Sequence, residues 1–175
     1  QVSDFSPLQS GMALLPDSLV AMLTAPNTGR LIRRWGHRRV LLLGLGVGAA
    51  GLVLLGLTIG VSYPAMVLPL MMVGFSFALV NTSANDLVLT SASEDRVGAA
   101  TGIAETAFEL GNALGIAISG SLVSILYLIA TGTSANLTAA VDTGGFTTAM
   151  AGTAVITGLL MAATTIGVAR AVRKA

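Results

Sequence analysis

Apolar residues along this chain gather in five long runs, separated by short polar or glycine-containing segments. A helix needs roughly 20 mainly apolar residues to cross the hydrocarbon core of a bilayer, and each run reaches that length. We therefore predict an all-α integral membrane protein with five transmembrane helices. The predicted helices cover residues 7–31, 40–61, 64–90, 97–130 and 146–172.

The basic residues are distributed unevenly among the connections between these runs. If each run crosses the membrane once, alternate connections lie on opposite sides. One side then receives all nine Lys and Arg residues. The other side receives the N-terminus and residues 61–63 and 131–145, which carry no basic residue. Because Lys and Arg concentrate in cytoplasmic segments, we predict that the N-terminus is outside the cell and the C-terminus inside.

The composition supports a membrane protein and argues against an enzyme. Of the 175 residues, 54% are hydrophobic and 10% are charged, whereas soluble domains carry about a quarter charged residues. Cysteine is absent and histidine occurs once, so we expect no metal site, no cofactor and no catalytic triad. The net charge of +1 gives no indication of a nucleic-acid partner. Any work the protein does would draw on an ion gradient.

Acidic residues inside the apolar runs are the main candidates for chemistry. Glu105 and Glu109 are four residues apart and share one helix face, with Asn112 close to the same stripe. Intramembrane acids usually face the bundle interior or a watery cavity. Two neighbouring carboxylates there resist ionising together, so one of them can hold a proton and exchange it for a cation. Phe108 adds an apolar, cation–π surface, and Asp17 is a further candidate from the middle of its run.

Each of these acids also has a purely structural interpretation. Asp17 could be satisfied within the bundle by an Asn or Thr side chain. Glu105 could lie near the cytoplasmic headgroups and simply be hydrated. Asp86 falls at the cytoplasmic end of its run, where solvation or a contact with the preceding basic segment is the favoured interpretation.

A basic segment between the first two runs carries a recognisable spacing, Gly29-Arg30-Leu31-Ile32-Arg33-Arg34-Trp35-Gly36-His37-Arg38-Arg39. It resembles the cytoplasmic signature of the major facilitator superfamily, approximately G-x-L-x-D-R-x-G-R-R. Arg33 stands where the signature has Asp, as in the degraded copy found in the C-terminal half of that family. The alternative is a plain basic loop anchored at the interface by Trp35, with His37 as an interfacial residue. The matching positions are Gly29, Leu31, Arg34 and Gly36, and the arginine pair of the signature is matched one position later by Arg38 and Arg39.

Two further stretches, 81–86 and 104–115, look like the fourteen-helix drug/proton antiporter branch of the same superfamily. That resemblance implies a bacterial inner-membrane transporter that exports lipophilic or quaternary ammonium cations in exchange for protons. It also implies that residues 1–175 form part of the C-terminal bundle and need N-terminal helices as a partner, besides the lipid bilayer.

Gly111, Gly115 and Gly120 form a stripe of small residues on the fourth run. Small residues allow close approach between membrane helices, and the family resemblance implies that this stripe packs against the N-terminal half. Because the chain supplies only five helices, a different class of function stays open. The chain could be a non-transporting membrane fragment, or a structural subunit that works only beside a separate N-terminal half.

Overall fold

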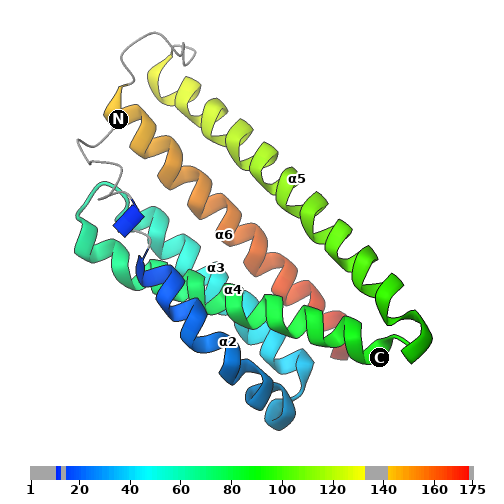
Figure 1. Cartoon of the computed structure of the whole chain (residues 1–175). Coiled ribbons are helices and arrows are strands. Elements are labelled where there is room, and N and C mark those ends of the chain that lie inside the picture. The colour runs from blue at the N-terminus through cyan, green and yellow to red at the C-terminus, as the bar shows by residue number, and fades with distance from the viewer. Residues whose placement is uncertain (1–10, 13–14, 133–141, 174–175) are drawn as a thin grey trace.

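A computed structural model describes residues 11–12, 15–132 and 142–173 of the chain, and the described residues form helices without any strand. The prediction of an all-α protein is therefore confirmed for this part of the chain. A short 3-10 turn, η1, precedes α5 (Figure 1). The elements are α2 (Leu15–Trp35), α3 (His37–Thr58), α4 (Tyr63–Ser91), η1 (Glu94–Arg96), α5 (Val97–Thr131) and α6 (Thr143–Arg173).

The connection between α2 and α3 is much shorter than predicted. The sequence suggested a loop over residues 30–39, but α2 continues to Trp35 and α3 begins at His37. Gly36 alone separates the two helices. The predicted loop was wrong because Arg is a good helix former, so the basic residues continue the helices on both sides. The beginning of the first predicted run, residues 7–10, lies outside the described residues.

Gly36 has a backbone conformation that other residues rarely adopt. Its φ is 82° and its ψ is 152°, in a region that is essentially restricted to glycine. A Cβ added at Gly36 would meet no atom within 4 Å. The requirement for glycine is therefore conformational and not steric.

Gly36→Ala is expected to lower the free energy of unfolding by about 1–3 kcal/mol, the usual cost of such a strained backbone. Gly102→Ala is the matched control, because a Cβ there also meets nothing within 4 Å but lies on the regular helix α5. Alanine should leave stability there unchanged or slightly raised. Thermal unfolding of the purified chain in detergent micelles measures both, and equal effects would contradict the strain argument.

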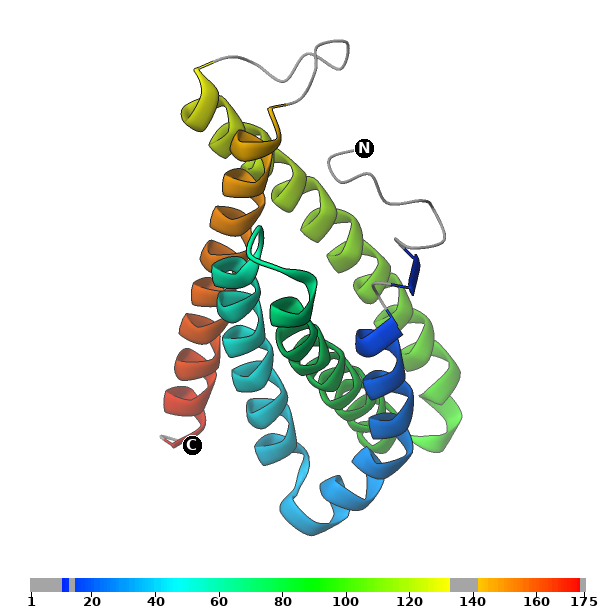
Figure 2. The ribbon, with the colours of Figure 1, turned by 90° about the vertical axis from the view of Figure 1, so that its left-hand side faces the viewer.

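The helices form a tight group of four with a fifth helix more loosely attached. Helix α3 packs against α4 and α6, and α2 packs against α4. Helix α5 runs beside α6 and reaches α4 near its own beginning (Figures 1 and 2). The buried core is small, with Ile32, Val40 and Leu79 meeting where α2, α3 and α4 converge. Most of α5 is exposed, with Tyr127 as its buried residue.

Glycines allow the packed helices to approach each other closely. A Cβ added at Gly56 of α3 would lie 2.6 Å from the carbonyl oxygen of Ala151 on α6. A Cβ at Gly158 of α6 would lie 2.9 Å from the carbonyl oxygen of Ala49 on α3. Both distances are shorter than a carbon–oxygen contact allows. Backbone-to-backbone packing through small residues is typical of membrane helices, so the α3–α6 contact depends on these glycines.

Four helices are long and apolar enough to cross a membrane, and they make this a multi-pass membrane protein. The qualifying spans are His37–Thr58, Tyr63–Ser91, Glu94–Thr131 and Thr143–Gly167. Helix α2 is not among them, because its polar and charged residues and its prolines lower the mean hydropathy of its described length. A fifth crossing through α2 therefore stays a prediction.

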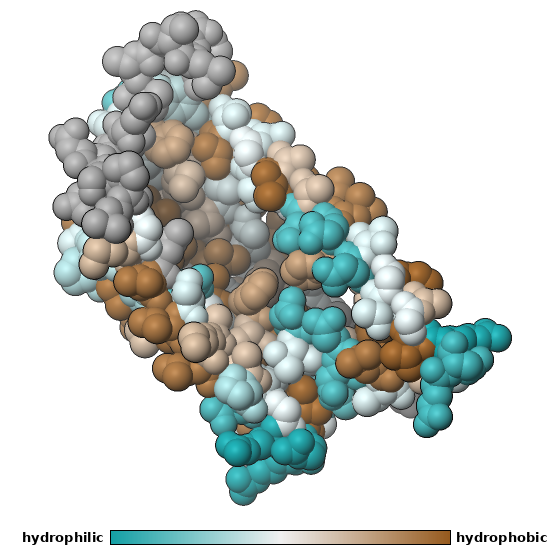
Figure 3. Space-filling view, viewed as in Figure 1, coloured by the Kyte–Doolittle hydropathy of each residue, from teal (hydrophilic) through white to brown (hydrophobic). Residues whose placement is uncertain are grey.

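Charged side chains gather at one end of the bundle. The α2–α3 junction, η1 and the end of α6 all lie there (Figure 2), and hydrophilic surface marks this end in Figure 3. The bundle thus places alternate connections at opposite ends, as the predicted topology requires. Which end faces the cytoplasm stays a prediction. The arginines at this end whose side chains are described are Arg30, Arg33, Arg34, Arg38, Arg39, Arg96 and Arg170.

Candidate functional site

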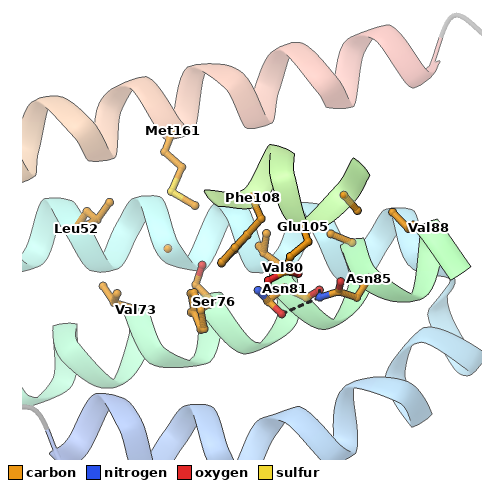
Figure 4. A pocket seen from close by; sticks show the side chains of 14 residues that line it. Leu52, Val73, Ser76, Val80, Asn81, Asn85, Val88, Glu105, Phe108 and Met161 are labelled. Carbon is orange, nitrogen blue, oxygen red and sulfur yellow. Dashed lines mark hydrogen bonds between the residues drawn. The ribbon is translucent and has the colours of Figure 1, made fainter. Parts of the chain in front are cut away.

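A cavity of about 490 Å³ lies among α3, α4, α5 and α6 (Figure 4). Helix α4 supplies the largest part of its lining, and α5 contributes one short stretch near its own beginning. Most of the lining is apolar, with a few polar groups on α4 and α5, which is the usual make-up of a small-molecule site. The lining residues are Gly48, Leu52, Val73, Ser76, Phe77, Val80, Asn81, Ala84, Asn85, Val88, Ala104, Glu105, Phe108 and Met161.

Glu105 and Phe108 are the two predicted site residues that the structure brings together in this cavity. They lie one turn apart on α5, and Glu105 carries the one ionisable side chain among the described lining residues. Phe108 is 41% exposed, so its ring is accessible to a ligand. Glu105 is itself exposed, so a cation can reach its carboxylate and rest its apolar part against the walls of the cavity. The cavity is therefore suited to a small cation with an apolar body.

The other predicted residues of α5 lie outside the cavity. Glu109 and Asn112 are exposed along the helix and are not among the lining residues. In Figure 3 hydrophilic surface appears on the face between the middle of α5 and α4. A role for Glu109 and Asn112 in binding therefore stays a prediction, and they would have to act from the open side of α5.

Asp17 also lies away from the cavity. It is at the contact between α2 and α4, whereas the cavity lies where α4 faces α3, α5 and α6. It is half-buried on α2, and a Cβ added at Gly74 of α4 would meet both its backbone oxygen and, at 2.6 Å, its carboxylate. The α2–α4 contact at this point has no room for a larger residue than glycine. Helix α4 thus separates Asp17 from Glu105, so the two acids do not belong to one site. A role for Asp17 in binding stays a prediction.

Asn81 and Asn85 line the cavity, although sequence reasoning did not single them out as site residues. They are four residues apart on α4, and Nδ2 of Asn85 lies 3.0 Å from Oδ1 of Asn81. The same nitrogen lies 3.1 Å from the backbone oxygen of Asn81. The sequence feature that could have identified them is their spacing. Residues four apart lie on one helix face, as Glu105 and Glu109 also do.

The basic segment is connected to α4 through His37 and Asp86. Nε2 of His37 lies 2.6 Å from Oδ2 of Asp86, which ties the first turn of α3 to the end of α4. The sequence left solvation and a contact with the basic segment open for Asp86, and the structure shows the contact. The two side chains are 34% and 44% exposed, and even a fully charged pair with this exposure would contribute only about 0–1 kcal/mol. The pair therefore orients the helix ends more than it stabilises them.

The remaining residues of the basic motif and the small-residue stripe make few contacts. Arg34, Arg38 and Arg39 are exposed and form no ion pair within the described part of the chain. A Cβ added at any glycine of the α5 stripe would meet nothing within 4 Å. Packing of this stripe against further helices stays a prediction. The stripe consists of Gly111, Gly115 and Gly120.

Comparison with known proteins assigns the chain to a family. The sequence profile of the Major Facilitator Superfamily matches residues 1–166. The multidrug efflux pump LfrA of Mycolicibacterium smegmatis is 27% identical over 164 residues, which cover 93% of this chain and 32% of the pump. The methyl viologen resistance protein SmvA of Salmonella typhimurium is 32% identical over 124 residues, covering 70% of this chain and 25% of that protein.

These relatives agree with the resemblance that the two sequence stretches suggested, since one is named as a multidrug pump and the other as a methyl viologen resistance protein. The chain spans about a third of the length of LfrA and a quarter of that of SmvA. The profile match, in contrast, extends over nearly the whole chain. The helical bundle, its four membrane-spanning helices and this match together show that the chain belongs to the major facilitator superfamily.

Proposed function

We propose that this chain forms part of a secondary transporter that exports lipophilic or quaternary ammonium cations in exchange for protons. The observation that carries the proposal is the position of Glu105, which places one carboxylate on a largely apolar cavity. A cation with an apolar body would contact Phe108, Phe77 and Met161 while its charge lies beside the carboxylate. The names of the relatives, which refer to drug efflux and methyl viologen resistance, support the same class of cargo.

Exchange would follow from competition for a single carboxylate. A proton and a cation can each neutralise the Glu105 carboxylate, but the carboxylate cannot hold both at once. A cation that binds beside this carboxylate therefore displaces the proton. Glu109, one turn further along α5, is a second carboxylate that could receive this proton. Binding of cation and binding of proton are therefore mutually exclusive at this site.

The proposal includes an orientation in the bacterial inner membrane. The basic end of the bundle would face the cytoplasm, in keeping with the positive-inside rule. The motif residues Gly29, Arg34, Gly36, Arg38 and Arg39 would then lie at the cytoplasmic surface around the α2–α3 junction. The cation would reach the cavity from that side.

A second candidate function is that of a subunit which works only with a separate N-terminal half. Transporters of this superfamily move one helix bundle against another around a central site, and this chain spans a third or less of its relatives. The exposed face of α5, with Gly111, Gly115 and Gly120, is the surface that such a half would cover. Co-purification of this chain with a separately produced N-terminal half would favour the subunit.

The proposed exchange is tested by measuring proton release when a cation binds. The purified chain in lipid nanodiscs receives 2-(naphthalen-2-yl)ethyl-trimethylammonium in weakly buffered solution, and empty nanodiscs serve as the control for lipid partitioning. We expect saturable binding accompanied by release of protons, and weaker binding as the pH falls. Saturable binding without proton release would contradict exchange. Absence of binding by the chain, with or without an N-terminal half, would contradict the proposed function as a whole.

A further inference from the structure

The two asparagines on the cavity wall form a pre-arranged pair. Nδ2 of Asn85 donates to the backbone oxygen of Asn81 at 3.1 Å and to Oδ1 of Asn81 at 3.0 Å. A carbonyl oxygen can only accept a hydrogen bond, so the Asn85 atom beside the Asn81 backbone must be the amide nitrogen. This contact fixes the orientation of the Asn85 amide. Its two N–H groups are used within α4, and its carbonyl oxygen Oδ1 is left as an acceptor.

Oδ1 of Asn85 has no hydrogen-bond donor within the described part of the chain. Asn85 and Glu105 both line the cavity, from α4 and α5 respectively. Figure 4 shows the Glu105 side chain reaching from α5 towards the asparagine pair. No hydrogen bond joins Glu105 to either asparagine among the described residues. The cavity thus presents two kinds of oxygen acceptor, a carboxylate and a fixed amide carbonyl, from two facing helices.

Two acceptors of this kind suit an ammonium group that carries N–H donors. A primary ammonium has three N–H groups and can donate to the carboxylate and to the amide oxygen together. A trimethylammonium group has the same charge but no donor, so it interacts with the carboxylate by charge alone. It would also cover Oδ1 of Asn85 without pairing it, and a buried acceptor left unpaired lowers affinity.

We propose that Asn85, oriented by Asn81, is a specificity-determining residue that makes the cavity prefer protonated amines bearing N–H groups over quaternary ammonium cations. This inference rests on the proposed function, since it concerns the cation that binds beside Glu105. Asn81 is a positioning residue, because it acts on the cation through the Asn85 amide. Quaternary cations still bind, held by the charge of Glu105 and the apolar walls.

The experiment compares two probes that differ only at nitrogen, 2-(naphthalen-2-yl)ethylammonium and its trimethylammonium counterpart. Their dissociation constants are measured with the full chain in nanodiscs at a pH where the amine is charged. The wild-type chain is expected to bind the N–H probe about tenfold more tightly, the ratio that one hydrogen bond to a charged group produces. In Asn85→Ala this preference should disappear, because the N–H probe loses an acceptor while the trimethylammonium probe binds as tightly as to the wild type or more tightly, since it no longer covers an acceptor that it cannot pair.

Two variants guard against a general loss of structure. Asn27→Ala is the matched control, because Asn27 is an exposed asparagine on α2 that also donates to the backbone one turn earlier, away from the cavity. It should keep the wild-type ratio. Asn85→Gln retains the amide on a longer side chain and should show an intermediate ratio.

Each remaining outcome overturns the inference. If the ratio of the two dissociation constants is the same in Asn85→Ala as in the wild type, Asn85 does not set the preference. If the wild-type chain binds both probes equally tightly, the proposed preference does not exist. In both cases the proposed function would still stand if the trimethylammonium probe binds and this binding depends on Glu105. If neither probe binds, the proposed function fails together with the inference.

Discussion

Glu105→Gln is expected to weaken binding of the trimethylammonium probe by roughly 30-fold and to abolish the accompanying proton release. The substitution keeps the size of the side chain and removes the one charge on the described cavity lining. A bound cation would cover the Glu105 carboxylate, and losing one partner of such a covered charge pair costs about 2 kcal/mol or more, which corresponds to a factor of roughly 30 in affinity. Titration of the purified variant in nanodiscs, with a pH-sensitive dye in the solution, measures both quantities.

Two other glutamates show whether the effect is specific to the cavity. Glu94 lies on η1, is exposed and does not line the cavity, so Glu94→Gln should behave as the wild type. Glu109→Gln leaves the cavity charge in place and should reduce proton release more than cation affinity. If Glu109→Gln abolished cation binding and Glu105→Gln did not, the cation would bind on the exposed face of α5 and not in the cavity.

Gly56→Ala is expected to destabilise the bundle by about 1–3 kcal/mol, the usual cost of overpacking a close contact. The new Cβ would lie 2.6 Å from the carbonyl oxygen of Ala151 and 2.7 Å from a methyl group of Val155. The Ala151 oxygen belongs to the backbone of α6, so it cannot move aside without moving that helix. Thermal unfolding of the purified chain in detergent micelles should therefore show a lower midpoint than the wild type.

The control for this substitution lies on the same helix. A Cβ added at Gly46 meets nothing within 4 Å, so Gly46→Ala tests the change in helix propensity without any close contact. Because alanine favours a helix more than glycine does, this variant should be as stable as the wild type or more stable. A midpoint lowered equally in both variants would show that the α3–α6 contact is not as close as described.

Much of the fold could be predicted because the relevant signal is local. A long apolar run needs only its own sequence to indicate a membrane helix, and α3, α4, α5 and α6 all follow such runs. The i, i+4 spacing of Glu105 and Glu109 likewise places them on one helix face before any tertiary contact is known. The basic motif indicated the family through its resemblance to a known signature, and the family match agrees with it.

The sequence was less informative where a helix boundary depends on a single residue. The segment around Gly36 was predicted to be a loop, yet both helices continue up to this glycine. Polar and basic residues are compatible with a loop and with the end of a helix. The unusual φ of Gly36 decides between them, and that angle is a property of the folded backbone.

The class of the protein, its helices and the residue types able to carry chemistry can be inferred from the sequence, because they depend on composition and on spacing along one helix. Which of these residues lie close together becomes clear from the packing of the helices. The structure placed Glu105 opposite Asn85 in one cavity and Asp17 behind α4. It also showed close packing at Gly56, while Gly111 meets nothing. Contacts between helices depend on how each helix is rotated and shifted against its neighbours, and no single run of residues encodes that.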